Sequence, residues 1–149
     1  MLNGAGVRVI VLKIYVAALY LPARNDDGDA ILRAHKPSRL YMHLLRNLTM
    51  DELKSGITGV LQATLTPEQA SPLDSRVRQL DSIIATRQVW QKGTTFAIDY
   101  LPNVGTTISI NGVDQGRIAG SDFNEALLRI WIGDRPRDLH LRKALLGIR

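Results

Sequence analysis

The feature that most constrains this fold is the dipeptide Asn111-Gly112, which stands between two runs of alternating apolar residues. A type I′ turn needs positive φ at both central residues, and Asn followed by Gly meets this need best. The runs therefore predict a hairpin with strands over 106–110 and 113–119, and the same two-residue period predicts an earlier strand over 96–100. Short turns join all three strands, so this part of the chain is predicted to form an antiparallel meander.

The rest of the chain combines strand-like segments with helices of 3.6-residue period. Thr49 and Glu52 have the spacing of a capping box, which predicts the start of one helix. Pro67 and Pro72 are expected to bracket a loop. Strands are predicted over residues 4–21 and 38–48, and helices over residues 30–35, 49–65, 73–87, 121–132 and 137–146.

This order of elements predicts an α+β fold. Strand–helix–strand alternation of the parallel kind is absent, so an antiparallel sheet with helices packed on one face is expected. The 149 residues suit a single domain over 1–149. No run approaches the roughly 18 apolar residues that a spanning helix needs, so no transmembrane segment is predicted.

The net charge of +5 raises the question of an anionic partner. The 19 Lys and Arg residues are scattered, and the sequence has no ladder of aromatic and basic residues for stacking bases. We interpret the charge as a solvated basic surface and predict no nucleic-acid partner, with anionic lipid or nucleic acid as the alternatives. The sequence indicates no particular oligomeric state.

The sequence contains no pattern typical of a metal site or a cofactor site. Cysteine is absent, which excludes disulfides and thiolate metal sites. The histidines His35, His43 and His140 lack metal-ligand spacing, and the glycine pair within 4–6 lacks the preceding strand and third glycine of a dinucleotide loop. We therefore predict no metal and no cofactor.

Arg8 is the most informative charged residue, because it lies within the most apolar segment of the chain. A guanidinium keeps its charge, so a buried Arg8 needs an anion or several hydrogen-bond acceptors. The alternative is an arginine on an edge strand whose head group reaches solvent.

Three stretches form a wider pattern. The first comprises residues 2–8 (LNGAGVR) and 13–21 (KIYVAALYL), the second runs from Lys92-Gly93 through Asn111-Gly112 to 116–120, and the third, 123–133, ends in LRIWIG. In this order they resemble the chalcone isomerase family, and its bacterial chalcone isomerase-like branch most of all. The resemblance implies an open-faced β-sandwich: a large antiparallel sheet, helices against it, and a ligand cleft between them.

The resemblance also implies two possible activities. The family's plant enzymes close a chalcone to a flavanone, whereas members related to plant plastid proteins bind fatty acids and hold the carboxylate with an arginine and a tyrosine. Arg8 matches the arginine shared by both branches, and Tyr15 falls where the fatty-acid binders have tyrosine. Leu53, Val60 and Ile130 fall where the enzymes have tyrosine, asparagine and threonine.

Aliphatic residues at three enzymatic positions favour binding over catalysis. Leu53, Ile57 and Val60 recur on one helical face, and we expect them to line the cleft with Ile130; plain core packing is the alternative. We therefore expect non-catalytic binding of a fatty acid or similar small apolar carboxylate, anchored by Arg8. The alternative is an isomerase of the chalcone type, an intramolecular lyase that takes a polyphenol-like ligand and uses Arg8 in catalysis.

The spacing of Arg8 and Tyr15 raises an objection. The two are seven residues apart, which puts their side chains on opposite faces of a straight strand. A bulge or bend within 9–13 would bring them together. Without one, Tyr20 and Tyr41 are the substitutes for Tyr15.

The compartment is inferred from the resemblance alone. Bacterial relatives often carry export signals, whereas residues 1–4 show neither a basic nor an apolar signal region. A periplasmic protein whose export signal has been removed is the first expectation, and a cytoplasmic location is the alternative.

Overall fold

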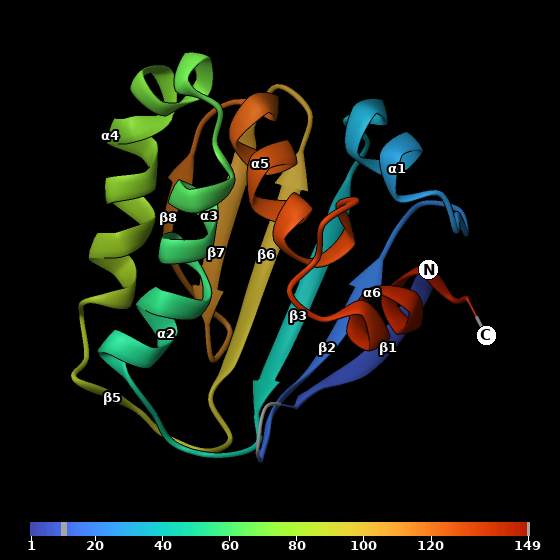
Figure 1. The fold of residues 1–149 in the computed structure, drawn as a ribbon. Coiled ribbons are helices and arrows are strands. Elements are labelled where there is room, and N and C mark those ends of the chain that lie inside the picture. The colour runs from blue at the N-terminus through green and yellow to red at the C-terminus, as the bar shows by residue number, and fades with distance from the viewer. Residues whose placement is uncertain (10–11, 149) are drawn as a thin grey trace.

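A six-stranded antiparallel sheet organises the chain (Figure 1). The computed structural model describes residues 1–9 and 12–148. Across the sheet the strand order is β1-β2-β3-β6-β7-β8, and β4 pairs with β5 separately. The bounds are β1 Leu2–Val9, β2 Lys13–Tyr20, β3 Ser38–Leu44, β4 Leu48–Thr49, β5 Val89–Trp90, β6 Thr95–Leu101, β7 Gly105–Ile110 and β8 Val113–Ile118.

The helices gather on one side of this sheet, where α3, α5 and α6 lie across its face (Figure 1). The predicted α+β class, with an antiparallel sheet and helices packed against it, is confirmed. Within the described ranges, no helix has both the length and the apolar character needed to cross a bilayer. The helix bounds are α1 Gly28–Ala34, α2 Met50–Gly56, α3 Thr58–Thr64, α4 Pro67–Ile84, α5 Ser121–Ile132 and α6 Leu139–Leu146.

The predicted meander forms β6, β7 and β8. Asn111 and Gly112 adopt φ of 50° and 80°, the positive values that a type I′ turn requires. Ile110 and Val113 close the hairpin as a directly opposite pair. The turn residues therefore set the register next to the hairpin, and a register shift between Ile108 and Ser109 changes it farther along the two strands.

Alternation along the strands separates the sheet into a helix-covered face and an open face. On β3, Leu40, Met42 and Leu44 are buried against the helices. The residues between them, such as Tyr41 and His43, point to the other face and are less buried. Every second residue of the strand therefore faces the helices and contributes to the hydrophobic core.

The single strand-rich segment predicted over 4–21 is instead two strands, and this is a correction. β1 and β2 pair antiparallel, with Arg8 directly opposite Tyr15 and a register shift between Arg8 and Val9. Residues 10–11, which the prediction included, lie outside the described residues. Since opposite residues of an antiparallel pair project to the same face, the seven-residue spacing does not separate these two side chains.

The single helix predicted over 49–65 was also wrong, because it is two helices. The helix predicted over 49–65 starts at its capping box but divides at Ile57 into α2 and α3. The single proton of the Thr58 hydroxyl is shared between the Lys54 carbonyl oxygen at 3.1 Å and Oδ1 of Asp81 at 2.9 Å. A hydrogen bond from a threonine back to the preceding turn bends helices.

The loop predicted between the two prolines belongs to α4 instead. Pro67 occupies the first helical turn, where its missing N–H costs nothing, and Pro72 lies inside the helix. The Gln69 side chain accepts from the Thr66 N–H at 3.0 Å, and a buried stripe that includes Leu73 and Val77 stabilises the helix despite the hydrogen bond lost at Pro72.

Two glycines let α6 approach β1 closely. A side-chain carbon at Gly4 would collide with the carbonyl oxygen of Ala144, and one at Gly6 would lie 2.7 Å from the Cβ of Ala144. Arg8 is next in the same helix-facing row of β1, and it therefore lies beside the first turn of α6. The close packing of α6 on β1 therefore sets the position of Arg8 relative to the start of α6.

Candidate functional site

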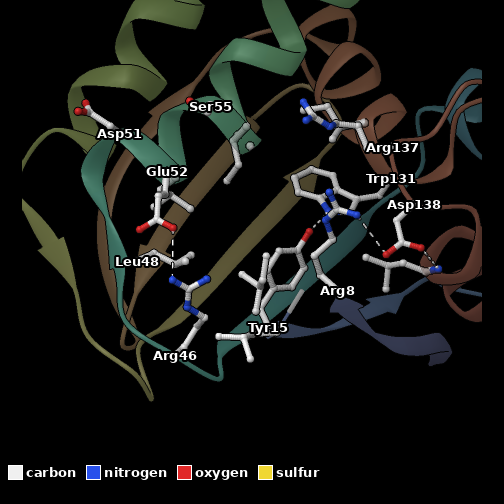
Figure 2. A pocket seen from close by; sticks show the side chains of 17 residues that line it. Arg8, Tyr15, Arg46, Leu48, Asp51, Glu52, Ser55, Trp131, Arg137 and Asp138 are labelled. Carbon is white, nitrogen blue, oxygen red and sulfur yellow. Dashed lines mark hydrogen bonds and ion pairs between the residues drawn. The ribbon is translucent and has the colours of Figure 1, made fainter. Parts of the chain in front are cut away.

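A cavity of about 550 Å³ lies between the β1–β2 pair, α2, the end of α5 and the start of α6. Its inner wall is mainly hydrocarbon, from residues that include Ile14, Leu48, Leu53, Ile57 and Ile130. Its polar groups divide into two sets. Figure 2 shows Arg8, Tyr15, Trp131 and Asp138 close together, with Arg46 and Glu52 farther away.

Arg8 lines this cavity and does not extend into bulk solvent. Its Nη1 donates to Oδ2 of Asp138 at 3.3 Å, and the two side chains are only 17% and 13% exposed. The other carboxylate oxygen of Asp138 accepts from the backbone N–H of Leu141 and so caps α6. One fixed carboxylate therefore holds the arginine at the cavity wall.

The Asp138 carboxyl is stabilised in its ionised form. Burial on its own raises the pKa of this group, but hydrogen bonds from the Leu141 N–H and the Arg8 guanidinium outweigh burial. The net result is that the pKa of Asp138 lies below its ordinary value. The ion pair with Arg8 is accordingly formed at neutral pH.

Tyr15 shares the pocket with Arg8 because the two face each other across β1 and β2. The Tyr15 hydroxyl oxygen accepts a hydrogen bond of 2.9 Å from Nε1 of Trp131 on α5. Burial raises the pKa of the Tyr15 hydroxyl, and the opposing effects of Trp131 and Arg8 are smaller. Tyr15 is therefore a neutral phenol that retains its proton.

The predicted apolar residues do not all reach the cavity. Leu53, Ile57 and Ile130 line it, from α2, the junction after α2, and α5. Val60 is not among the lining residues; it is 6% exposed and belongs to the hydrophobic core. Val60 lies in α3, beyond the interruption of the helix at Ile57, whereas Leu53 lies in α2 before it. Tyr20 and Tyr41, the proposed substitutes for Tyr15, lie on the open face.

Sequence reasoning missed Trp131, Arg137 and Asp138, all of which line the cavity. Trp131 was part of the family-like stretch, but nothing in the sequence indicated the direction of its indole N–H. Asp138 does carry a sequence signal, because an acidic residue immediately before a helical pattern is typical of an N-cap. Its pairing with Arg8 spans 130 positions, and no local pattern predicts such a contact.

The rim of the cavity carries balanced charge. Arg46 pairs with Glu52 at 3.4 Å, and both side chains are more than a third exposed. Arg137 also lines the cavity and, among the described residues, makes no ion pair within 4.0 Å. The described residues contain no cluster of three or more His, Asp or Glu side chains arranged to hold a metal.

Comparisons with known proteins agree with this architecture. A family model described as chalcone isomerase-like matches residues 1–147. A direct comparison with curated protein sequences finds no match. The structure is similar to the crystal structure of a fatty-acid binding protein from Arabidopsis thaliana, with a TM-score of 0.75 and 14% sequence identity over 97% of this chain and 85% of that chain. At this level of identity, the likeness shows a shared fold.

Proposed function

The chain belongs to the chalcone isomerase-like family, and from that premise we propose that it binds a fatty acid or similar small apolar carboxylate without catalysing a reaction. The observation that carries the proposal is the placement of Arg8 opposite Tyr15 on the wall of an apolar cavity. The similar structure from Arabidopsis thaliana is described as a fatty-acid binding protein, which supports the same ligand class here. The motif over 2–8 supports a place in the bacterial branch.

The cavity has the size and surface for an alkyl chain. Its volume of about 550 Å³ lies within the range usual for small-molecule sites. Burial of each methylene contributes about 0.8 kcal/mol, so a twelve-carbon chain supplies roughly 10 kcal/mol before the costs of ordering are subtracted. The aliphatic side chains of Leu53, Ile57 and Ile130 provide the contact surface.

The head group is proposed to bind at Arg8 and Tyr15. A guanidinium has five N–H donors, and the hydrogen bonds found among the described residues use only one of them, the one to Asp138. The remaining donors are available for a carboxylate, and charge-assisted hydrogen bonds of this kind are about twice as strong as neutral ones. Tyr15 adds a neutral phenol beside them.

Binding is favoured over isomerisation because positions that carry polar groups in the family's enzymes are aliphatic here. Leu53 and Ile130, which stand at two of the enzymatic positions, present only hydrocarbon to the cavity. A ring closure needs donors and acceptors that fix both ends of the substrate.

Isothermal titration with dodecanoate tests the proposal. Arg8→Met removes the charge and keeps an unbranched apolar stem in place of the aliphatic part of the arginine, and it is expected to weaken binding about 10-fold to 100-fold. Arg117→Met, at an exposed strand residue outside the cavity, is the control and should bind like the wild type. Absence of dodecanoate binding, or chalcone turnover above the spontaneous rate that disappears in Arg8→Met, would contradict non-catalytic acid binding.

A further inference from the structure

The hydrogen bond between Trp131 and Tyr15 determines which polar role the tyrosine can play. An indole N–H is a donor only, whereas a phenol both donates and accepts. Because Nε1 of Trp131 donates to the Tyr15 oxygen at 2.9 Å, the Tyr15 proton must point elsewhere. No acceptor for that proton occurs in the hydrogen bonds of the described part of the chain, so it is available to a ligand.

Two other side chains that line the cavity offer only hydrogen-bond donors to a ligand. Arg8 and Arg137 can only donate. Asp138 is the carboxylate in contact with Arg8, and both of its oxygens already accept, one from Arg8 and one from the Leu141 N–H. Among the described side chains, the head-group end of the cavity therefore presents mainly donors to a ligand, and the Asp138 carboxylate there already accepts from Arg8 and from the Leu141 N–H.

We infer that Trp131 is a positioning residue that makes Tyr15 a donor, so that the head-group site selects an ionised acid over an alcohol of the same chain length. This inference rests on the proposed function. A carboxylate group offers only hydrogen-bond acceptors, and its negative charge pairs with Arg8. A hydroxyl group has a proton that needs an acceptor, and it cannot form charge-assisted hydrogen bonds as strong as those of a carboxylate.

A pair of tryptophan variants separates this role from ordinary packing. Trp131→Phe keeps an aromatic ring in α5 and removes the donor. Trp90→Phe is the matched control, because the Trp90 N–H is also buried and donates at 3.1 Å to the Ile84 carbonyl oxygen, outside the cavity. A general loosening of the core would affect both variants, whereas loss of the donor to Tyr15 affects only the first.

The measurement is the ratio of affinities for dodecanoate and dodecanol, with folding checked by circular dichroism. We expect Trp131→Phe to weaken dodecanoate binding about threefold to tenfold with little change for dodecanol, and Trp90→Phe to keep the wild-type ratio. Tyr15→Phe should lower the ratio as well, and the double variant should lower it no further than Tyr15→Phe alone. If Trp131→Phe does not fold, the Tyr15 single variant still tests whether the Tyr15 hydroxyl contributes to the selection of the acid.

A second readout follows the tyrosine itself. The Trp131 hydrogen bond lowers the pKa of Tyr15, so its removal should raise that pKa further in a spectrophotometric titration. If wild-type protein binds dodecanoate but Trp131→Phe and Tyr15→Phe keep the wild-type ratio, the inference is wrong and the proposed function stands. If the wild type binds no dodecanoate, both are wrong.

Discussion

The Arg8 guanidinium and the Asp138 carboxylate form an ion pair at 3.3 Å that joins the cavity wall to the packing of α6. The carboxylate oxygen that is not paired with Arg8 caps that helix through the Leu141 N–H. A single side chain thus supports both a secondary-structure element and the proposed head-group site, so changes at Asp138 should affect stability and binding together.

Acid stability should depend on Asp138. Its pKa is depressed in the folded protein, so the stability that it contributes is present above the unfolded-state pKa and is lost as the pH falls through the folded-state pKa. Asp138→Asn can still cap α6 but has no charge. We expect it to be less stable than the wild type at pH 7 and to lose less stability between about pH 5 and pH 2.

Urea unfolding at several pH values measures this difference. Asp26→Asn, at an exposed loop residue, is the control and should follow the wild-type curve. Identical acid curves for wild type and Asp138→Asn would show that the ion pair contributes nothing to folding.

Arg137 should attract the ligand through its charge. It lines the cavity next to Asp138 and makes no ion pair within 4.0 Å among the described residues. Arg137→Gln is expected to weaken dodecanoate binding about threefold at low salt, with a smaller effect at high salt because exposed charges are screened. Arg135→Gln, in the same connection but outside this cavity, should have no such effect. Equal losses in both variants would mean that only the net charge of the protein matters.

Contact between α6 and β1 should require glycine at residue 4. Gly4→Ala places a methyl group against the carbonyl oxygen of Ala144, which has no flexible side chain to move aside. We expect a destabilisation of about 1–3 kcal/mol, measured by thermal or urea unfolding, together with weaker dodecanoate binding because α6 carries Asp138 at its start. Gly56→Ala, where an added methyl group meets no atom within 4 Å, should be neutral or slightly stabilising. A wild-type stability for Gly4→Ala would refute the close approach.

Alkaline titration should distinguish Tyr15 from the other tyrosines. The chain has four tyrosines, and burial raises the pKa of Tyr15. A component that ionises late should therefore be present in ultraviolet difference spectra, and it should be missing in Tyr15→Phe. Because the folded-state pKa is raised, the stability linked to Tyr15 is fully present below the unfolded-state pKa and is lost as the pH rises through the folded-state pKa. A Tyr15→Phe spectrum that still contains the late component would argue against a raised pKa of Tyr15.

Much of the fold was predictable because its signals are local. The Asn111-Gly112 turn and the Thr49–Glu52 capping box depend on residues close together in the chain, and both occur as predicted. Pro72 shows where local reasoning fails, because a proline that usually ends a helix is held inside α4 by the burial of residues on its neighbouring turns.

By itself, the sequence determined most of the strands and helices, the antiparallel character of the sheet and the identity of Arg8 as an unusual charge in an apolar segment. Only the tertiary structure decided that Arg8 and Tyr15 meet, because that depends on the pairing of β1 with β2. The same holds for the partners Asp138 and Trp131, which lie 130 and 116 positions away from the residues they contact. The physical reason is that hydrogen bonds and ion pairs act through space, and chain reversal and helix packing bring distant residues within their range.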